Sequence, residues 1–76
     1  MSEPQALPTA ADVLVETAAV LAALAAARLA EETRDLDEAR RAIDALTVLL
    51  PLLPEDSRRD VQAALANLQL AFADVV

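Results

Sequence analysis

The chain has 76 residues, a formal net charge of −7, and no cysteine, histidine, lysine or glycine. Without cysteine or histidine, disulfides, thiolate metal sites and imidazole catalysis are excluded, and the acidic balance argues against a nucleic-acid partner, whose phosphates require a basic face. Below roughly 70–80 residues a single core rarely supplies more than about 3–5 kcal/mol of net stability. Regular helix packing or oligomerisation must therefore compensate for the small core.

Alanine and leucine provide most of the hydrophobic fraction of 57%. Both residues favour helices, while the β-branched and aromatic residues that favour strands are scarce. The composition therefore predicts an all-α fold. Three expected helices with short connections predict a three-helix up-down-up antiparallel bundle, which we expect to dimerise into a larger helical bundle. The expected helices cover residues of about 9–32, 35–50 and 54–75 in a single domain at 9–76, after a flexible N-terminal tail at residues 1–8.

The first expected helix contains a run without any polar side chain, Ala18 to Ala27. Thr9 is its expected N-cap, with Asp12 three residues further on. Its larger apolar side chains share one stripe with Thr17 and are expected to face inward: Val13, Leu14, Val20, Leu21 and Leu24. The alanines are then expected outside. Because a helix that is hydrophobic all round must be covered on several sides, this helix predicts contact with another chain.

The second expected helix begins after Asp35, an N-cap, and ends or bends at Pro51 because proline lacks an N–H and disfavours helical geometry in the preceding residue. The third begins between Pro54 and Ser57, which is a candidate cap. The two helices are expected to form the intramolecular core through six large side chains: Ile43, Leu46, Leu50, Leu65, Leu68 and Phe72. A second line on the third helix lies behind this stripe: Ala63, Ala66, Leu70 and Ala73.

Enzymatic and metal-binding functions have no support in the residue pattern. Nucleophilic catalysis needs a base beside the hydroxyl, and the chain has neither histidine nor lysine. The acidic residues between Glu31 and Glu38 lack the glycine-containing calcium loop and are expected to favour the start of the second helix. We therefore expect a non-enzymatic protein without catalytic, cofactor or metal residues.

The localisation expected from the sequence is cytoplasmic, with no membrane span. A transmembrane helix needs about 20 apolar residues, and the charged residues that flank the apolar run leave a shorter gap: Asp12, Glu16, Arg28 and Glu31. A peripheral membrane helix is a weaker alternative, since the polar face is not basic.

Self-association is the leading functional prediction. Exposed apolar area on a soluble chain usually marks an interface, and a symmetric homodimer is the commonest arrangement. The residues predicted at this interface are Ala19, Ala22, Ala26, Leu29 and Leu70. The alternative is a monomeric adaptor or inhibitor that presents the same apolar face to a different protein. Alanine also tolerates water, so an unused surface remains a third reading.

The segment from Asp35 to Leu46 (DLDEARRAIDAL) resembles the central signature of a family of small bacterial proteins, catalogued as domain of unknown function 1844. Pro54-Glu55-Asp56 and the later Leu68-to-Phe72 segment match two further motifs of that family in order, so the resemblance covers residues 13–72. The resemblance implies a compact helical bacterial protein and does not indicate any particular activity. The chain departs from the family at residues 50–53, where a lysine- and glycine-bearing turn is expected, and at Phe72, where the family has tyrosine.

Overall fold

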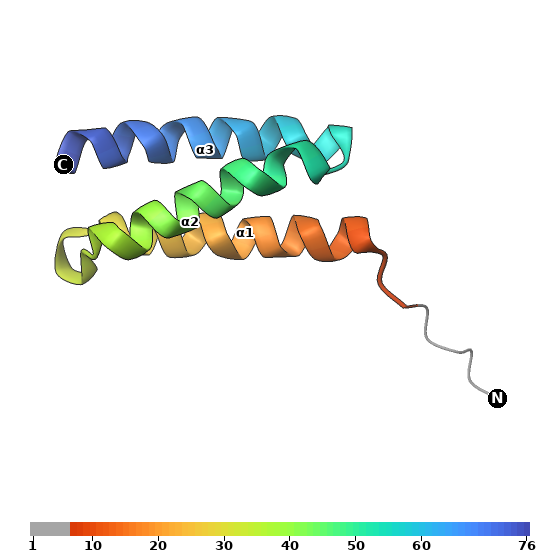
Figure 1. Ribbon diagram of the computed structural model, residues 1–76, viewed down its shortest axis with the longest axis horizontal. Coiled ribbons are helices and arrows are strands. Elements are labelled where there is room, and N and C mark those ends of the chain that lie inside the picture. Colours follow the sequence, from red (N-terminus) through yellow and green to blue (C-terminus); the bar gives the residue numbers. More distant parts are fainter. Residues whose placement is uncertain (1–6) are drawn as a thin grey trace.

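The computed structural model describes residues 7–76 and contains three α-helices in that range (Figure 1). They are α1 (Ala10–Leu29), α2 (Leu36–Leu49) and α3 (Glu55–Val75), joined by the short 3₁₀ turns η1 (Glu31–Thr33) and η2 (Leu50–Leu52). No strand is present in the described part of the chain. The prediction of an all-α fold with three helices is confirmed, whereas most of the predicted N-terminal tail lies outside the described residues.

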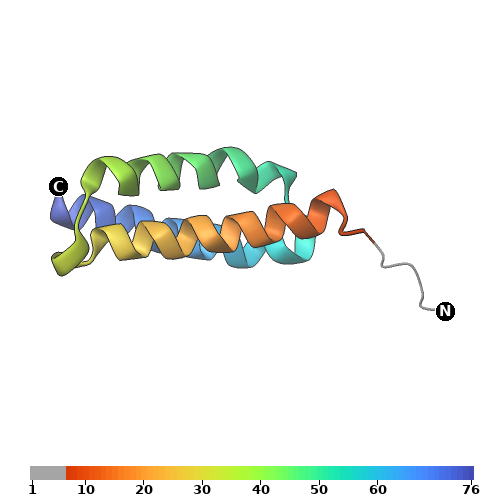
Figure 2. The same ribbon diagram turned by 90° about the horizontal axis from the view of Figure 1, so that it is seen from below.

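The helices follow one another up, down and up (Figure 1). Consequently α1 and α3 run in the same direction, and α2 runs against both. Seen after a quarter turn, α2 lies on one side of the pair formed by α1 and α3 (Figure 2). Packing of α1 against α2 is more extensive than packing of α1 against α3. The contact between α1 and α2 is therefore the most extensive in the bundle, and α3 packs less extensively against both α1 and α2.

Side-chain caps begin the first two helices, as the sequence predicts. The Thr9 hydroxyl accepts a hydrogen bond from the Asp12 N–H at 3.0 Å, and the Asp12 carboxylate accepts one from the Thr9 N–H at 3.4 Å. Asp35 accepts from the Glu38 N–H at 3.1 Å. In contrast, α3 begins directly after Pro54 without a side-chain cap. The prediction that Ser57 caps α3 is wrong, because Ser57 already lies in the first turn.

The first helix ends at Leu29, three residues before the boundary expected from the sequence. Ala30 adopts an extended conformation, which ends the α-helical hydrogen bonding. Two groups from the following turn then bind the last carbonyls: the Arg34 guanidinium donates to Leu29 at 3.2 Å, and the Asp35 N–H donates to Arg28 at 2.8 Å. The turn thereby supplies the hydrogen bonds that a glycine cap provides in other helices.

The core consists of side chains from all three helices and the second turn. Ten of the residues that the structure describes are buried: Ala18, Ala25, Leu29, Ala39, Ala42, Ile43, Leu46, Leu53, Leu65 and Leu68. Of the six large core residues predicted from the sequence, Ile43, Leu46, Leu65 and Leu68 are buried, and Leu50 and Phe72 are partly buried against them. Leu46 and Leu53 are the largest side chains to be fully buried.

The predicted inward stripe of the first helix is correct for Leu14 and Leu21, which are partly buried against the core, and wrong for its other three residues. Ala18 and Ala25 are fully buried at 0% exposure, whereas Val20 is 61% exposed and Val13 and Leu24 are also exposed. Helix α2 contributes two further buried alanines, Ala39 and Ala42, to the same core. Short side chains on both helices allow a close approach, so burial follows the contact with α2 rather than the size of the side chain.

Candidate protein-interaction groove

An apolar groove runs along the seam between α1 and α3, and we call it the α1–α3 groove. It joins two hollows of about 630 Å³ and about 230 Å³, which share Ala22 and Ala64. Its α1 side extends from Val15 to Ala30, and its α3 side extends from Ser57 to Ala71. None of these lining residues comes from α2.

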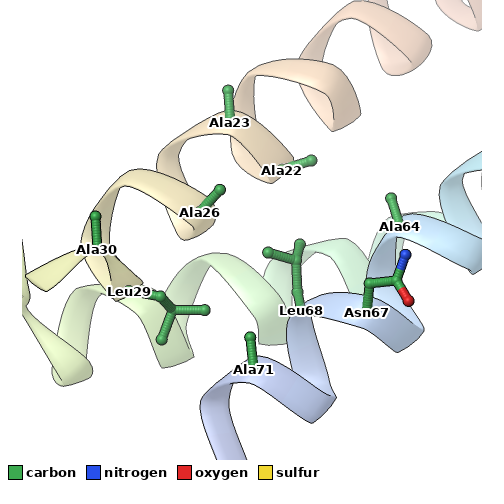
Figure 3. Close-up of a pocket in the computed structure, with 9 residues that line it drawn as sticks. All are labelled: Ala22, Ala23, Ala26, Leu29, Ala30, Ala64, Asn67, Leu68 and Ala71. Atoms are coloured by element: carbon green, nitrogen blue, oxygen red, sulfur yellow. The ribbon is translucent and has the colours of Figure 1, made fainter. Parts of the chain in front are cut away.

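Methyl groups form most of the groove walls, which explains why the seam stays open. Ala22 and Ala26 of α1 face α3, and Ala64 and Ala71 line the opposite wall (Figure 3). Large side chains fill the centre of the bundle between α2 and these two helices. Alanine side chains are too short to close the remaining space between α1 and α3, and Leu68 projects into it as the largest side chain from α3.

Four of the five residues predicted at an interface line the groove. Ala19, Ala22 and Ala26 lie along its α1 wall and are exposed or half-buried. Leu29 also lines it, but it is only 7% exposed and belongs to the core, so the prediction that it lies on an uncovered face is wrong. Leu70 is 71% exposed on a different face of α3 and does not line the groove.

The α3 wall was not predicted from the sequence. The line of Ala63, Ala66, Leu70 and Ala73 is exposed on another face of the helix. The wall instead consists of residues on the opposite flank of the inward stripe: Ser57, Asp60, Ala64, Asn67 and Ala71. These residues recur at intervals of three or four, which was the available signal. The sequence does not show which of the two flanks of α3 faces α1, because that depends on where α1 lies in the fold.

The groove has few polar groups. Ser57, Asp60 and Asn67 provide them, all from α3, and Asp60 is the one charged residue in the lining. Between residues 7 and 76, no three potential metal ligands of the acidic, histidine or cysteine type lie close enough to hold an ion. Ligand pockets for small molecules normally contain several convergent polar groups, whereas these three are spread along one helix.

Comparisons of the chain with protein-family models, with curated proteins and with solved structures give no match. The resemblance to the family named above stays a prediction. Within the described residues, α1 is the one helix that is long and apolar enough to cross a membrane by length and composition. Three of its residues are buried: Ala18, Ala25 and Leu29. Such a helix is weak evidence for a span, and we treat a lipid surface as an outcome to be tested.

Proposed function

We propose that this protein is a non-enzymatic interaction module that receives a helix of another polypeptide in the α1–α3 groove. The observation that carries the proposal is an apolar groove bounded by two parallel helices. From Val15 to Leu29 it follows about 21 Å of α1, at a rise of about 1.5 Å per residue. That is the length of a helix of about fifteen residues. A helix in this place would occupy the fourth position of a four-helix bundle.

The exposed surface of α1 supports this use of the groove. Contiguous apolar area on the surface of a soluble protein is typical of an interaction site. Ala19, Ala23 and Ala26 are exposed on the groove side of the helix. Burial of this wall would enlarge the hydrophobic core, which is small because the chain is short. It would add apolar contact without disturbing the packing of α1 against α2.

Two sources of the docking helix agree with the sequence. A second copy would give a homodimer, in which each chain offers the same surface to the other. A different protein would make the chain an adaptor or inhibitor. Both require the α1–α3 groove to accept a helix, so one experiment tests the common step.

The absence of cysteine allows that experiment to use single-cysteine variants. Ala23→Cys places a nitroxide label at the edge of the groove, where the side chain points away from α3 (Figure 3). Ala66→Cys places a matched label on an exposed face outside it. We expect electron paramagnetic resonance to show slower motion of the Ala23→Cys label when unlabelled protein or an amphipathic helical peptide is added in excess, while the Ala66→Cys label keeps its mobility.

Light scattering and Ala22→Asp complete the test. If a second copy is the partner, the molar mass will be at least twice the chain's 8.0 kDa, and Ala22→Asp will reduce it while helicity is retained. Ala63→Asp, on an exposed face of α3 outside the groove, is the control. A monomer whose Ala23→Cys label responds neither to its own concentration nor to any helical peptide would refute the proposed function.

A further inference from the structure

The charge around the α1–α3 groove points to one kind of occupant: an amphipathic helix of a different protein, with basic residues flanking its apolar stripe. This inference rests on the proposed function and specifies its partner. Asp60 lies in the groove lining, and Glu16 is exposed on α1, one residue after Val15 and three before Ala19. Asp60 thus places one carboxylate in the groove on α3, and Glu16 places a second on α1 at helical spacing from the groove residues Ala19 and Ala23, outside the lining itself.

Helix capping does not account for these two carboxylates. The dipole of a helix favours acidic residues mainly in the first turn, which in α1 contains Asp12 and in α3 contains Glu55 and Asp56. Glu16 and Asp60 lie in the second turn of their helices. Since α1 and α3 run in the same direction, both carboxylates lie toward the same end of the groove (Figure 1). An occupant with cations at that end would gain charge complementarity on both sides.

The arginines of this chain lie mainly elsewhere. Arg40 and Arg41 on α2 pair with Asp44 and Glu38 at 3.9 and 3.8 Å, and these are the two ion pairs in the described part of the chain. The guanidinium groups of two others bind backbone carbonyls: Arg34 binds Leu29 and Arg58 binds Leu53. Arg59 lies beside Asp60, but Glu55 and Asp56 line the same surface hollow with them. The groove lining itself contains no basic residue.

A second copy fits this electrostatic pattern less well. Each chain carries a net charge of −7, so association of two copies brings like charges together. The helix that a copy could offer most readily, α1, has Asp12 and Glu16 near its start and Arg28 as its one basic residue. A helix with basic residues beside its apolar stripe would instead be attracted by the carboxylates of Glu16 and Asp60.

The direction of the fourth helix follows from the same charges. In an up-down-up-down bundle the occupant runs antiparallel to α1 and α3, so its C-terminal half lies beside Glu16 and Asp60. Cations near the C-terminus of a helix are also favoured by the helix's own dipole. Because the walls are alanine, the occupant must supply large apolar side chains such as leucine to fill the groove. The expected sequence has leucines at helical spacing and lysines or arginines in its last two turns.

Three synthetic peptides test this inference against the unlabelled wild-type protein, with binding measured by calorimetry. The first has a leucine stripe and lysines flanking it in the C-terminal half. The second has the same composition with the lysines in the N-terminal half, and the third replaces the lysines by glutamates. We expect the first to bind most tightly, the third most weakly, and the affinity of the first to fall as salt rises. Glu16→Gln combined with Asp60→Asn should weaken binding of the first peptide by about threefold to tenfold.

Asp37→Asn is the control for these two substitutions, because Asp37 is exposed on α2 and does not line the groove. If the glutamate peptide binds as tightly as the lysine peptides, or if the neutral double variant keeps full affinity, the basic partner is refuted and the groove function stands. If no peptide binds but the Ala23→Cys label is slowed by excess unlabelled protein, a second copy is the occupant of the groove. The basic partner is then refuted, and the proposed groove function stands. If neither occurs, both proposals fail. Binding to vesicles of neutral phosphatidylcholine without peptide binding would assign the surface to lipid and overturn both.

Discussion

The two sides of α1 differ although both consist mainly of alanine. Ala18 and Ala25, which belong to the core, are completely buried, whereas Ala26 is exposed in the α1–α3 groove. Ala25 and Ala26 are consecutive residues with opposite surroundings. Alanine therefore does not decide whether a helix face is buried. Burial of a face of α1 depends on the neighbouring helix: on how close that helix lies and on which side chains it contributes to the contact.

The physical difference lies in what fills the space between the helices. Across the α2 side, small residues permit close approach, and larger neighbours such as Ile43 and Leu46 complete the core. Across the α3 side, Ala64 and Ala71 meet another alanine wall at a distance that methyl groups cannot bridge. Stability should accordingly depend on the α2 side, while the α1–α3 groove is available for binding.

Truncation of a buried leucine should have the largest effect on the free energy of unfolding. Leu46 is fully buried, so Leu46→Ala should lower the free energy of unfolding by about 2–5 kcal/mol. Since a domain of this size has about 3–5 kcal/mol in total, much of the variant will be unfolded. Urea denaturation followed by far-ultraviolet circular dichroism measures the change.

The same substitution at an exposed leucine is the control. Leu70 lies on the surface of α3 outside the groove, and Leu70→Ala should change the free energy of unfolding by less than about 0.5 kcal/mol. Equal losses at the two positions would contradict the burial of Leu46 and the exposure of Leu70. They would show that Leu70 is covered in solution, for example by another copy.

Enlarging the two consecutive alanines tests the comparison more directly. Ala25→Leu inserts three carbons into a closed contact and should lower the free energy of unfolding by about 1–3 kcal/mol. Ala26→Leu places the same side chain beside an open groove, where it can be accommodated, and should change stability by less than about 0.5 kcal/mol. Thermal or urea unfolding distinguishes the variants. A larger loss for Ala26→Leu would mean that the seam between α1 and α3 is closed.

The elements were predictable because their signals are local. The capping pairs Thr9–Asp12 and Asp35–Glu38 start two helices, and Pro51 disrupts the second. The core residues Ile43 and Leu46 of α2 were also predicted correctly, since they are large apolar side chains three residues apart on one face of the helix. The end of α1 was harder to place, because the hydrogen bonds that stop it come from Arg34 and from the backbone of Asp35 rather than from a glycine.

The inward face of α1 was not predictable from side-chain size. A search for the largest apolar residues selects Val13 and Val20, which are exposed, over Ala18 and Ala25, which are buried. Where every face of a helix is apolar, periodicity no longer distinguishes them, and the position of α2 determines the outcome. The α1 wall of the groove was predicted through Ala19, Ala22 and Ala26. The α3 wall was missed, because two flanks of that helix carry alanines at similar spacing.

The smallest expected effect concerns the helix starts at the acidic end of the groove. Thr9→Ala removes the hydroxyl that accepts from the Asp12 N–H, and should lower the free energy of unfolding by about 0.5–2 kcal/mol. Ser57→Ala removes a hydroxyl from the first turn of α3, which starts without a side-chain cap, and should cost less. Hydrogen exchange should show faster exchange in the first turn of α1 for Thr9→Ala alone. If Ser57→Ala is the more harmful change, the expected order is wrong and the Ser57 hydroxyl stabilises the start of α3 more than Thr9 stabilises the start of α1. If the order is as expected, loosening the first turn of α1 should also weaken peptide binding, because that turn immediately precedes the segment of α1 that carries Glu16 into the rim of the groove.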